Sequence, residues 1–330
     1  WSARGPSNMC ASCSSLIKAI DAYIAKADDD LIEQLKAAGF QVDDDMLKTL
    51  QALEDEIAEA LVEETAVFTT AVDAALDLQD FAEKIWPDIK LTDTLAATLS
   101  SIFAKRFEEL MPGLVEAYLQ ITDRDLHLEQ VSKKTAAWVQ SWSEQLGEIM
   151  KLNSHNTIER LLTDGLQNGS SISEFTQSIL DSGVRNEYYR ARTVSVTEVL
   201  RAHSAAQQEA FMQSPAVTRK KWRHTGSRNN NARRNHVAMD GKVVDKEKPF
   251  VLKGADGSTY YPMFPRDPSL PVGETANCHC LDEPIVDDDI LGLSLEERQE
   301  LQRQAVADMA DEWERALDEE NKAKAGIEEA

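Results

Sequence analysis

The sequence lacks the patterns that mark membrane proteins and several common enzyme classes. No apolar run approaches the ~18 residues that a membrane span needs, and no signal segment opens the chain. A Gly-rich phosphate loop, an H-E-x-x-H motif, a nucleophile elbow and the H-x-E with P-C-x-x-C pattern of zinc deaminases are all missing. We therefore expect a soluble, unsecreted protein that makes no contact with a membrane. Because the chain begins with Trp1, we also expect that a segment precedes it or has been removed.

Positive charge is scarce, and most of it lies in one segment. The 330 residues hold 35 Lys and Arg against 58 Asp and Glu, which gives a net charge of −23. Residues 185–253 nevertheless carry a net charge of +9, between acidic segments of −16 (1–150) and −14 (254–330). Two interpretations stay open: the basic segment pairs with acidic regions of the same or a neighbouring subunit, or it contacts DNA phosphates.

Cysteine is also scarce, but its spacing is suggestive. Cys10 and Cys13 form a C-x-x-C pair, while Cys278 and Cys280 form a C-x-C pair. Zinc is one possible cofactor, bound either by all four thiolates or by Cys278, Cys280 and His236. The third alternative is buried or free thiols, and a reducing cytoplasm disfavours disulfides.

Helical periodicity dominates the first half of the chain. Apolar residues recur at helical spacing over residues 15–38 and 44–61, and Pro87 predicts a break. Met111-Pro112-Gly113 predicts a kink or a second break. These apolar stripes are best explained as the core of a helical bundle.

Later helices are marked by their capping signals. Ser171-x-x-Glu174 has the spacing of a capping box and predicts a helix that ends near Gly183, followed by another over 186–213. Ser294-x-x-Glu297 predicts a last helix. Within 186–213, a group of polar residues is predicted to face the module that follows: Arg192, Thr197, Glu198 and Arg201. Glu198 and Arg201 can pair, and a simple surface ion pair is the alternative.

Periodicity changes between residues 219 and 280, where turn dipeptides and short β-prone runs replace helix. We therefore predict an α+β fold: a large all-helical N-terminal region, then a small mixed α/β module and a C-terminal helix. The expected divisions are an acidic helical domain over 1–150, helices and module over 151–286, and an acidic helix and tail over 287–330.

A spaced set of polar residues defines this module. It comprises Arg233, His236, Asp240, Gly241 and Asn277. Together they can form a polar network that holds a long loop, in which Gly241 supplies the positive φ of a turn. His236 with Arg233 could alternatively serve as the acid/base and cation of a nuclease or toxin-like enzyme.

The order Arg-x-x-His, Asp-Gly and Asn-Cys-x-Cys, preceded by a helix with Arg192, Thr197, Glu198 and Arg201, resembles the phage Mu F-like minor head proteins. The resemblance implies a structural, non-enzymatic protein of a tailed phage or prophage that takes part in head morphogenesis. It implies a place in the virion, at the portal vertex or in the capsid interior, after assembly in the bacterial cytoplasm. The implied partners are the portal protein and other head proteins, with non-specific contact to double-stranded DNA as a further possibility.

A final set of residues is predicted to contact DNA phosphates or an acidic partner, and it consists of Lys220, Lys221, Arg223, Arg228 and Arg234. Nothing in the segment resembles a groove-reading helix, so any DNA contact would be independent of base sequence.

Overall fold

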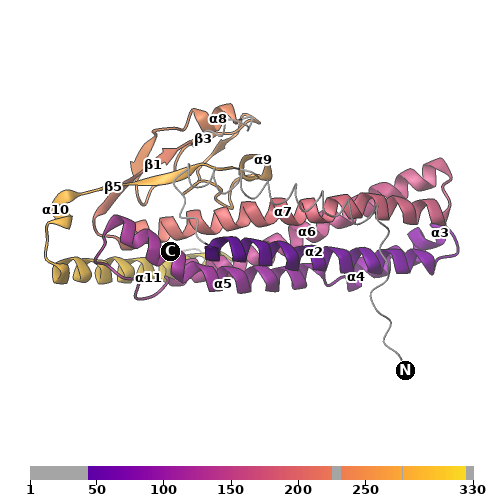
Figure 1. Ribbon diagram of the computed structural model, residues 1–330, viewed down its shortest axis with the longest axis horizontal. Coiled ribbons are helices and arrows are strands. Elements are labelled where there is room, and N and C mark those ends of the chain that lie inside the picture. The colour runs from indigo at the N-terminus through magenta and orange to yellow at the C-terminus, as the bar shows by residue number, and fades with distance from the viewer. Residues whose placement is uncertain (1–43, 225–231, 277, 325–330) are drawn as a thin grey trace, which may run out of the picture.

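The computed structural model describes residues 44–224, 232–276 and 278–324 as a long helical body that carries a small β-containing module near one end (Figure 1). The predicted α+β class is confirmed: the N-terminal part is helical, the sheets follow, and a helix closes the described chain. The helix expected over 15–38 lies outside the described residues.

The body is made of long helices that are joined by short connections. Its elements are α2 (Asp44–Asp73), α3 (Leu78–Asp80), η1 (Phe81–Ile85), α4 (Trp86–Thr92), α5 (Leu95–Thr122), α6 (Lys133–Asn168) and α7 (Ile172–Gln213). The module and C-terminal part contain β1 (Val217–Arg223), α8 (Arg234–Val237), β2 (Val243–Asp245), β3 (Leu252–Lys253), β4 (Thr259–Tyr260), α9 (Val272–Thr275), β5 (Leu281–Val286), α10 (Asp288–Leu291) and α11 (Leu295–Lys324).

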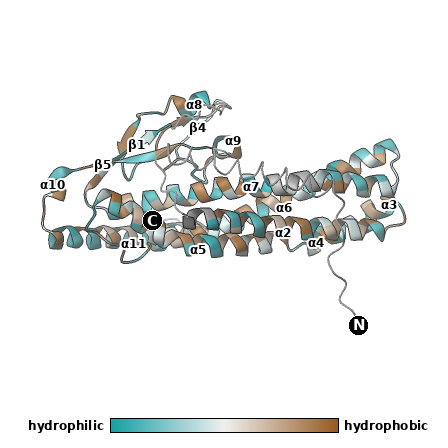
Figure 2. Cartoon of the chain, viewed as in Figure 1, coloured by the Kyte–Doolittle hydropathy of each residue, from teal (hydrophilic) through white to brown (hydrophobic). Residues whose placement is uncertain are grey.

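One apolar core runs between the long helices. α5 packs against α2, α6 and α7, and buried side chains such as Leu53, Phe103 and Leu200 meet there. Hydrophobic and hydrophilic segments alternate along these helices, as expected for helices with one buried face (Figure 2). Among the described residues, no helix is both long and apolar enough to cross a membrane.

A second core cluster closes the end of the body that lies away from the module. Phe81 and Trp86 from η1 and α4 pack there with Phe175 of α7. Pro87 stands at the start of α4, where its missing N–H costs no helical hydrogen bond, and the π-helical turn η1 precedes it. The predicted break at Pro87 is therefore a change of helix type within a nearly continuous segment.

Two other predicted breaks are absent, whereas the kink predicted as an alternative at Pro112 stays a prediction. α5 continues through Pro112 because Met111 and Val115, on either side of it, are both buried in the core. α7 likewise continues through Gly183, since Ile179 and Ala191 anchor the helix in the two separate core clusters. A helical glycine costs about 1 kcal/mol, which this packing outweighs.

Both predicted capping boxes are confirmed. The Ser171 N–H donates to Glu174 Oε2 at 2.7 Å, and the Glu174 N–H donates to Ser171 Oγ at 3.2 Å, at the start of α7. Ser294 and Glu297 exchange the same bonds, at 3.0 and 3.3 Å, at the start of α11. The reciprocal bonds explain why both helices begin where the sequence predicts.

α11 returns to the helical body and is fixed there by a buried ion pair. Arg298 donates to Asp123, in the connection after α5, at 2.5 Å, and Gln302 donates to the His127 carbonyl at 3.0 Å. The boundary expected at residue 150 falls within α6, and the core also includes Leu281 of the module. The division into domains stays a prediction.

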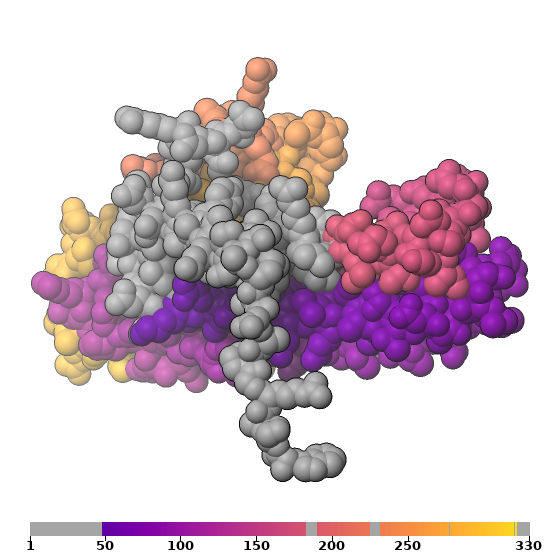
Figure 3. Space-filling model, turned by 45° about the vertical axis from the view of Figure 1, so that its right-hand side comes forward, coloured from indigo at the N-terminus to yellow at the C-terminus, as the bar shows by residue number. Residues whose placement is uncertain are grey.

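The module stands above the helical body and does not extend its long axis (Figures 1 and 3). β1 is the central strand of a three-stranded antiparallel sheet in the order β2-β1-β5, and β3 pairs with β4 in a separate two-stranded sheet. β2, β3 and β4 are short, and the module's own core cluster is small: Trp222, Met239, Phe250, Leu252, Leu270, Cys278 and Cys280.

The side chains of β1 alternate between the two faces of the sheet. Lys220 and Trp222 are fully buried, whereas Arg219 and Arg223 are exposed. The Lys220 ammonium donates to Gln208 Oε1 at 2.9 Å and to the Met263 carbonyl at 2.7 Å. The prediction that Lys220 contacts a phosphate or a partner is therefore wrong, because the period of two places it inside.

Burial makes charge costly at this position. It lowers the pKa of Lys220 to about 8, although the negative charges of Asp282 and Asp267 oppose the shift. Burial also raises the pKa of Asp282 to about 7, against the opposing charges of Lys220 and Arg266. Lys220 thus serves as an internal link between β1, α7 and the loop that contains Met263.

We expect Lys220→Met to lower the free energy of unfolding by about 2–4 kcal/mol, because two buried acceptors lose their donor and Asp282 loses a nearby cation. Chemical denaturation measures the change. The matched control, Arg219→Met, alters the exposed neighbour and should change stability by about 0.5 kcal/mol or less. Equal losses in the two variants would contradict the assignment of Lys220 to the interior.

Candidate functional site

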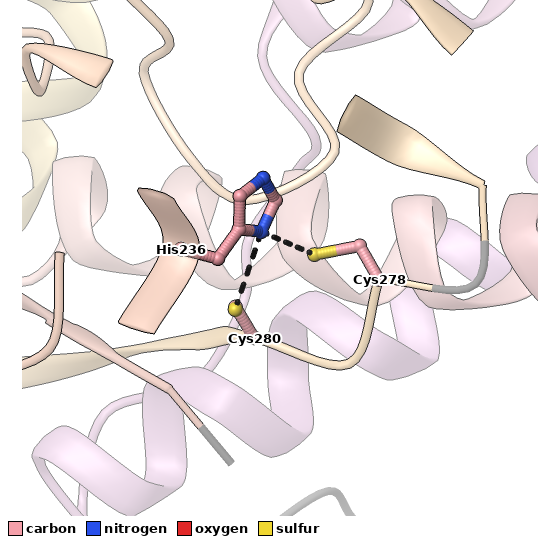
Figure 4. A group of neighbouring side chains, drawn as sticks. All are labelled: His236, Cys278 and Cys280. Atoms are coloured by element: carbon pink, nitrogen blue, oxygen red, sulfur yellow. Dashed lines mark hydrogen bonds between the residues drawn. The ribbon is translucent and has the colours of Figure 1, made fainter. Parts of the chain in front are cut away.

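His236, Cys278 and Cys280 meet inside the module (Figure 4). His236 belongs to α8, and the two cysteines lie just before β5. The imidazole Nδ1 is 3.5 Å from Cys278 Sγ and 3.7 Å from Cys280 Sγ. All three residues are 2 % exposed, so the cluster is shielded from solvent.

A second histidine approaches the cluster from the end of β1. His224 is partly exposed, and its Nδ1 lies 3.5 Å from Cys280 Sγ. Its backbone N–H donates to Asp240 Oδ1 at 2.9 Å. His224 therefore adjoins the cluster of His236, Cys278 and Cys280 through Cys280, and the four residues come from three separate segments of the sequence.

A carboxylate fixes the other side of the His236 ring. Glu274 Oε2 lies 2.8 Å from His236 Nε2 and also accepts from Asn235 Nδ2 at 2.9 Å, while Oε1 accepts from the Ala255 N–H at 2.8 Å. Burial opposes ionisation of Glu274, but these hydrogen bonds outweigh it and lower the pKa of the carboxyl. Since an ionised carboxylate can only accept, His236 Nε2 donates to Glu274, and Nδ1 is the ring nitrogen that faces the two sulfurs.

The two thiols differ in their readiness to ionise. The hydrogen bond with Cys280 lowers the pKa of Cys278 well below its usual value, against the effect of burial, and His236 and Arg266 act in the same direction. The same bond and burial raise the pKa of Cys280. Negative charge in the pair is thus favoured at Cys278, next to the guanidinium of Arg266.

Arg266 holds the loop that contains both cysteines. Its fully buried guanidinium donates from Nη1 to the carbonyls of Cys278, at 2.5 Å, and Cys280, at 2.8 Å. Nη2 donates to Ser204 Oγ of α7 at 2.5 Å. The backbone of Arg266 adopts φ 65°, a left-handed conformation that is uncommon for a residue with a Cβ.

Arg201 extends this connection into the helical body. It donates from Nη1 to the Arg266 carbonyl and pairs with Glu198, at 2.8 Å from Nε to Oε2. Glu198 Oε2 also accepts from Trp142 Nε1 of α6 at 2.8 Å, and the guanidinium of Arg201 lies 4.4 Å from the centre of the Trp142 ring. The predicted pairing of Glu198 with Arg201 is confirmed, and it is buried, not a surface pair.

The other residues of α7 that were predicted to face the module have different contacts. Arg201 reaches the module, whereas Arg192 donates to Glu54 of α2 at 2.9 Å, so its predicted orientation toward the module is wrong. The two arginines are nine positions apart, which is about two and a half turns and places them on opposite faces of the helix. Thr197 is buried.

The Arg-x-x-His and Asp-Gly residues support the sulfur cluster. Arg233 Nη2 donates to the Ala276 carbonyl at 2.6 Å, beside the cysteine loop. Asp240 holds the backbone of His224, and Gly241 adopts φ 77° while its N–H donates to the Trp222 carbonyl at 2.8 Å. Asn277, Cys10, Cys13 and Arg228 lie outside the described residues.

The predicted basic contact residues have different surroundings. Lys221 and Arg223 lie on the outer face of β1 and both pair with Glu283 of β5, with 2.5 Å between Lys221 Nζ and Glu283 Oε2. Arg234, at the start of α8, is exposed. The local pairing favours the interpretation that part of the basic charge is balanced within the module.

Sequence reasoning missed three residues of this site. Arg266 stands between Pro265 and the Asp267-Pro268 pair, and such a proline-rich loop was a signal of a fixed backbone. Glu274 is the only acidic residue between Asp267 and Asp282, and His224 was available as a further histidine in the module. Neither residue has a spacing that identifies its partner, because the contacts depend on the three-dimensional fold.

Comparison with known proteins identifies the family. Residues 156–282 match the family described as phage Mu protein F-like, and this range holds the whole sulfur cluster. YqbB of Bacillus subtilis (strain 168), an uncharacterized protein by name, is 37 % identical over 313 residues, which cover 89 % of this chain and 98 % of that protein.

A more distant similarity covers part of the chain. The NAD(+)–arginine ADP-ribosyltransferase EFV of Enterococcus faecalis (strain ATCC 700802 / V583) is 26 % identical over 167 residues, or 48 % of this chain and 31 % of that protein. No solved structure matches. From the family match and the relative that aligns along almost its entire length, the chain belongs to the phage Mu protein F-like family, a family of phage head morphogenesis proteins.

Proposed function

We propose that this protein is a minor head component that acts at the portal vertex or in the capsid interior during head assembly. The observation that carries the proposal is the set of contacts made by the residues of the Arg-x-x-His and Asp-Gly motifs, Arg233, His236, Asp240 and Gly241. Each of them holds a backbone or a buried neighbour inside the module, as expected of a structural part. The portal protein and other head proteins are the proposed partners.

A nuclease that uses His236 and Arg233 is the weaker candidate. A general base must reach the proton that it removes. His236 is 2 % exposed, with Glu274 at Nε2 and two sulfurs near Nδ1, and Arg233 donates to a backbone carbonyl. The ADP-ribosyltransferase activity named for the Enterococcus protein gives no second candidate, because the similarity covers less than a third of that protein.

We further propose that the outer face of the module touches packaged DNA through phosphates. Arg219 and Arg223 project from the same face of β1, and Arg234 is exposed on α8. Glu283 balances part of this charge, so the contact is weak and strongly dependent on salt.

Removal of the gene from a phage or inducible prophage should leave portal and capsid proteins but lower the yield of DNA-filled, infectious heads. Purified wild-type particles should contain the protein in few copies, and it should be captured together with the portal protein from assembling lysates. Mass spectrometry and electron microscopy of the particles measure both results. Normal yields of infectious heads without the gene, together with absence of the protein from wild-type particles, would contradict the proposal.

The enzymatic alternative has its own test on the purified full chain. Incubation with single- and double-stranded DNA in the presence of Mg²⁺ or Mn²⁺ should give no cleavage above a no-protein control. Cleavage that disappears in a folded His236→Ala variant would support the nuclease instead.

Replacement of Arg219, Arg223 and Arg234 by Ala should weaken duplex DNA binding at low salt by about tenfold or more. Because each lost phosphate contact removes about one unit of slope, the plot of log binding constant against log salt should flatten by about 2–3. The control triple variant, Lys84, Lys105 and Arg315→Ala, removes the same charge from the helical body and α11. Equal effects in both variants would show that only net charge matters, and the proposed DNA contact would be dropped.

A further inference from the structure

We propose that His224, His236, Cys278 and Cys280 bind one zinc ion at a structural site inside the module. Three of these residues are already gathered around one point, with their potential ligand atoms within 4.8 Å of one another. His224 contacts the same cluster through Cys280. Two thiolates and two imidazoles form a common donor set of structural zinc sites.

The three nitrogen–sulfur contacts in the cluster have the separation expected in a tetrahedral zinc centre. With Zn–S near 2.3 Å and Zn–N near 2.0–2.1 Å, such a centre places sulfur and nitrogen about 3.5 Å apart. The three nitrogen–sulfur distances in the cluster are 3.5, 3.5 and 3.7 Å. The His236 ring and both sulfurs therefore already have the spacing that a shared metal requires.

The orientation of the His236 ring suits a shared metal. Its Nε2 donates to Glu274, which leaves Nδ1 as the ring nitrogen that faces the sulfurs. Both sulfurs lie beside Nδ1, at 3.5 and 3.7 Å. A metal ion at this point would be coordinated by Nδ1 and both sulfurs at once.

The surroundings are those of a metal site with an ordered outer shell. A metal-bound histidine usually donates its other N–H to a carboxylate, and Glu274 occupies that position while its oxygens accept two further hydrogen bonds, from Asn235 and the Ala255 N–H. Arg266 fixes the backbone carbonyls of Cys278 and Cys280. The charges also balance, because two thiolates neutralise Zn²⁺ while Arg266 and Glu274 offset one another.

The fourth ligand closes the site from the side of β1. His224 is partly exposed, its Nδ1 lies 3.5 Å from Cys280 Sγ, and Asp240 holds its backbone N–H. With four protein ligands the ion has no open position for substrate, so the site is structural and not catalytic.

The architecture of the module explains the need for such a site. β3 and β4 contain two residues each, and the module's core cluster has few members, two of which are the cysteines themselves. Small modules with little apolar surface commonly depend on a metal or disulfides for stability. Zinc would join the end of β1, α8 and the start of β5 at one point.

The first test measures metal in untagged full-length protein. We expect about one equivalent of zinc, and loss of the metal to a strong chelator should lower the melting temperature and expose the module to protease. Replacement of zinc by Co²⁺ should give intense visible bands and a thiolate-to-metal charge-transfer band, both typical of a tetrahedral site with sulfur ligands. Protein without bound zinc that also gives no such cobalt spectrum would overturn the proposal.

Variants identify the ligands. Cys280→Ser and His236→Ala should retain less than about 0.2 equivalents of zinc, whereas the control Cys10→Ser/Cys13→Ser should keep the full equivalent. Glu274→Gln should weaken zinc binding about 10–100-fold without abolishing it. Loss of zinc in the Cys10/Cys13 variant would favour the all-cysteine site instead.

His224→Cys tests the fourth ligand without emptying the site. Three thiolates in place of two should raise the cobalt charge-transfer absorbance about 1.5-fold and leave the melting temperature of the zinc form nearly unchanged. An unchanged charge-transfer band would exclude residue 224 from the coordination shell.

Discussion

The buried guanidinium of Arg266 is the interaction on which the join between module and helical body depends. It binds the carbonyls of Cys278 and Cys280 on one side and Ser204 of α7 on the other, while its own carbonyl accepts from Arg201. Burial lowers the pKa of Arg266, and negative charge on the two cysteines opposes that shift. Two arginines can lie this close inside the protein because Glu198 and the Trp142 ring offset the charge of Arg201. The sulfur cluster and the helix–module contact are therefore parts of one connected polar network.

The residues of the Arg-x-x-His and Asp-Gly motifs have structural roles in this network. In sequence, Arg-x-x-His followed by Asp-Gly is compatible with catalysis, because it supplies a base and a cation. In the structure, Arg233 holds the loop before the cysteines and Asp240 holds His224. Gly241 makes the turn that returns the chain to β2. These roles are those of a scaffold, and they agree with the structural function that we propose.

Local signals allowed the sequence to predict much of the fold, and long-range contacts limited the rest. The capping boxes at Ser171 and Ser294 involve residues three apart, so they could be read directly. Pro112 and Gly183 were misleading because burial on both sides, which spacing does not reveal, keeps each helix intact. Lys220 was misassigned because a charged residue in a basic run gives no sign of the buried carbonyl that it meets. Arg266 and Glu274 act on partners brought close by the fold, so their roles became visible only in three dimensions.

α7 has a consequence for the dimensions of any assembly that contains this protein. It is a single helix of 42 residues, which at 1.5 Å per residue is about 63 Å long. One end lies in the distal core cluster through Phe175, and the other contacts the module through Ser204, Gln207 and Gln208. A continuous helix fixed at both ends sets a distance and an orientation. A component bound at the distal end would thus be held at a constant spacing from whatever the module touches, and the protein would act as a molecular ruler.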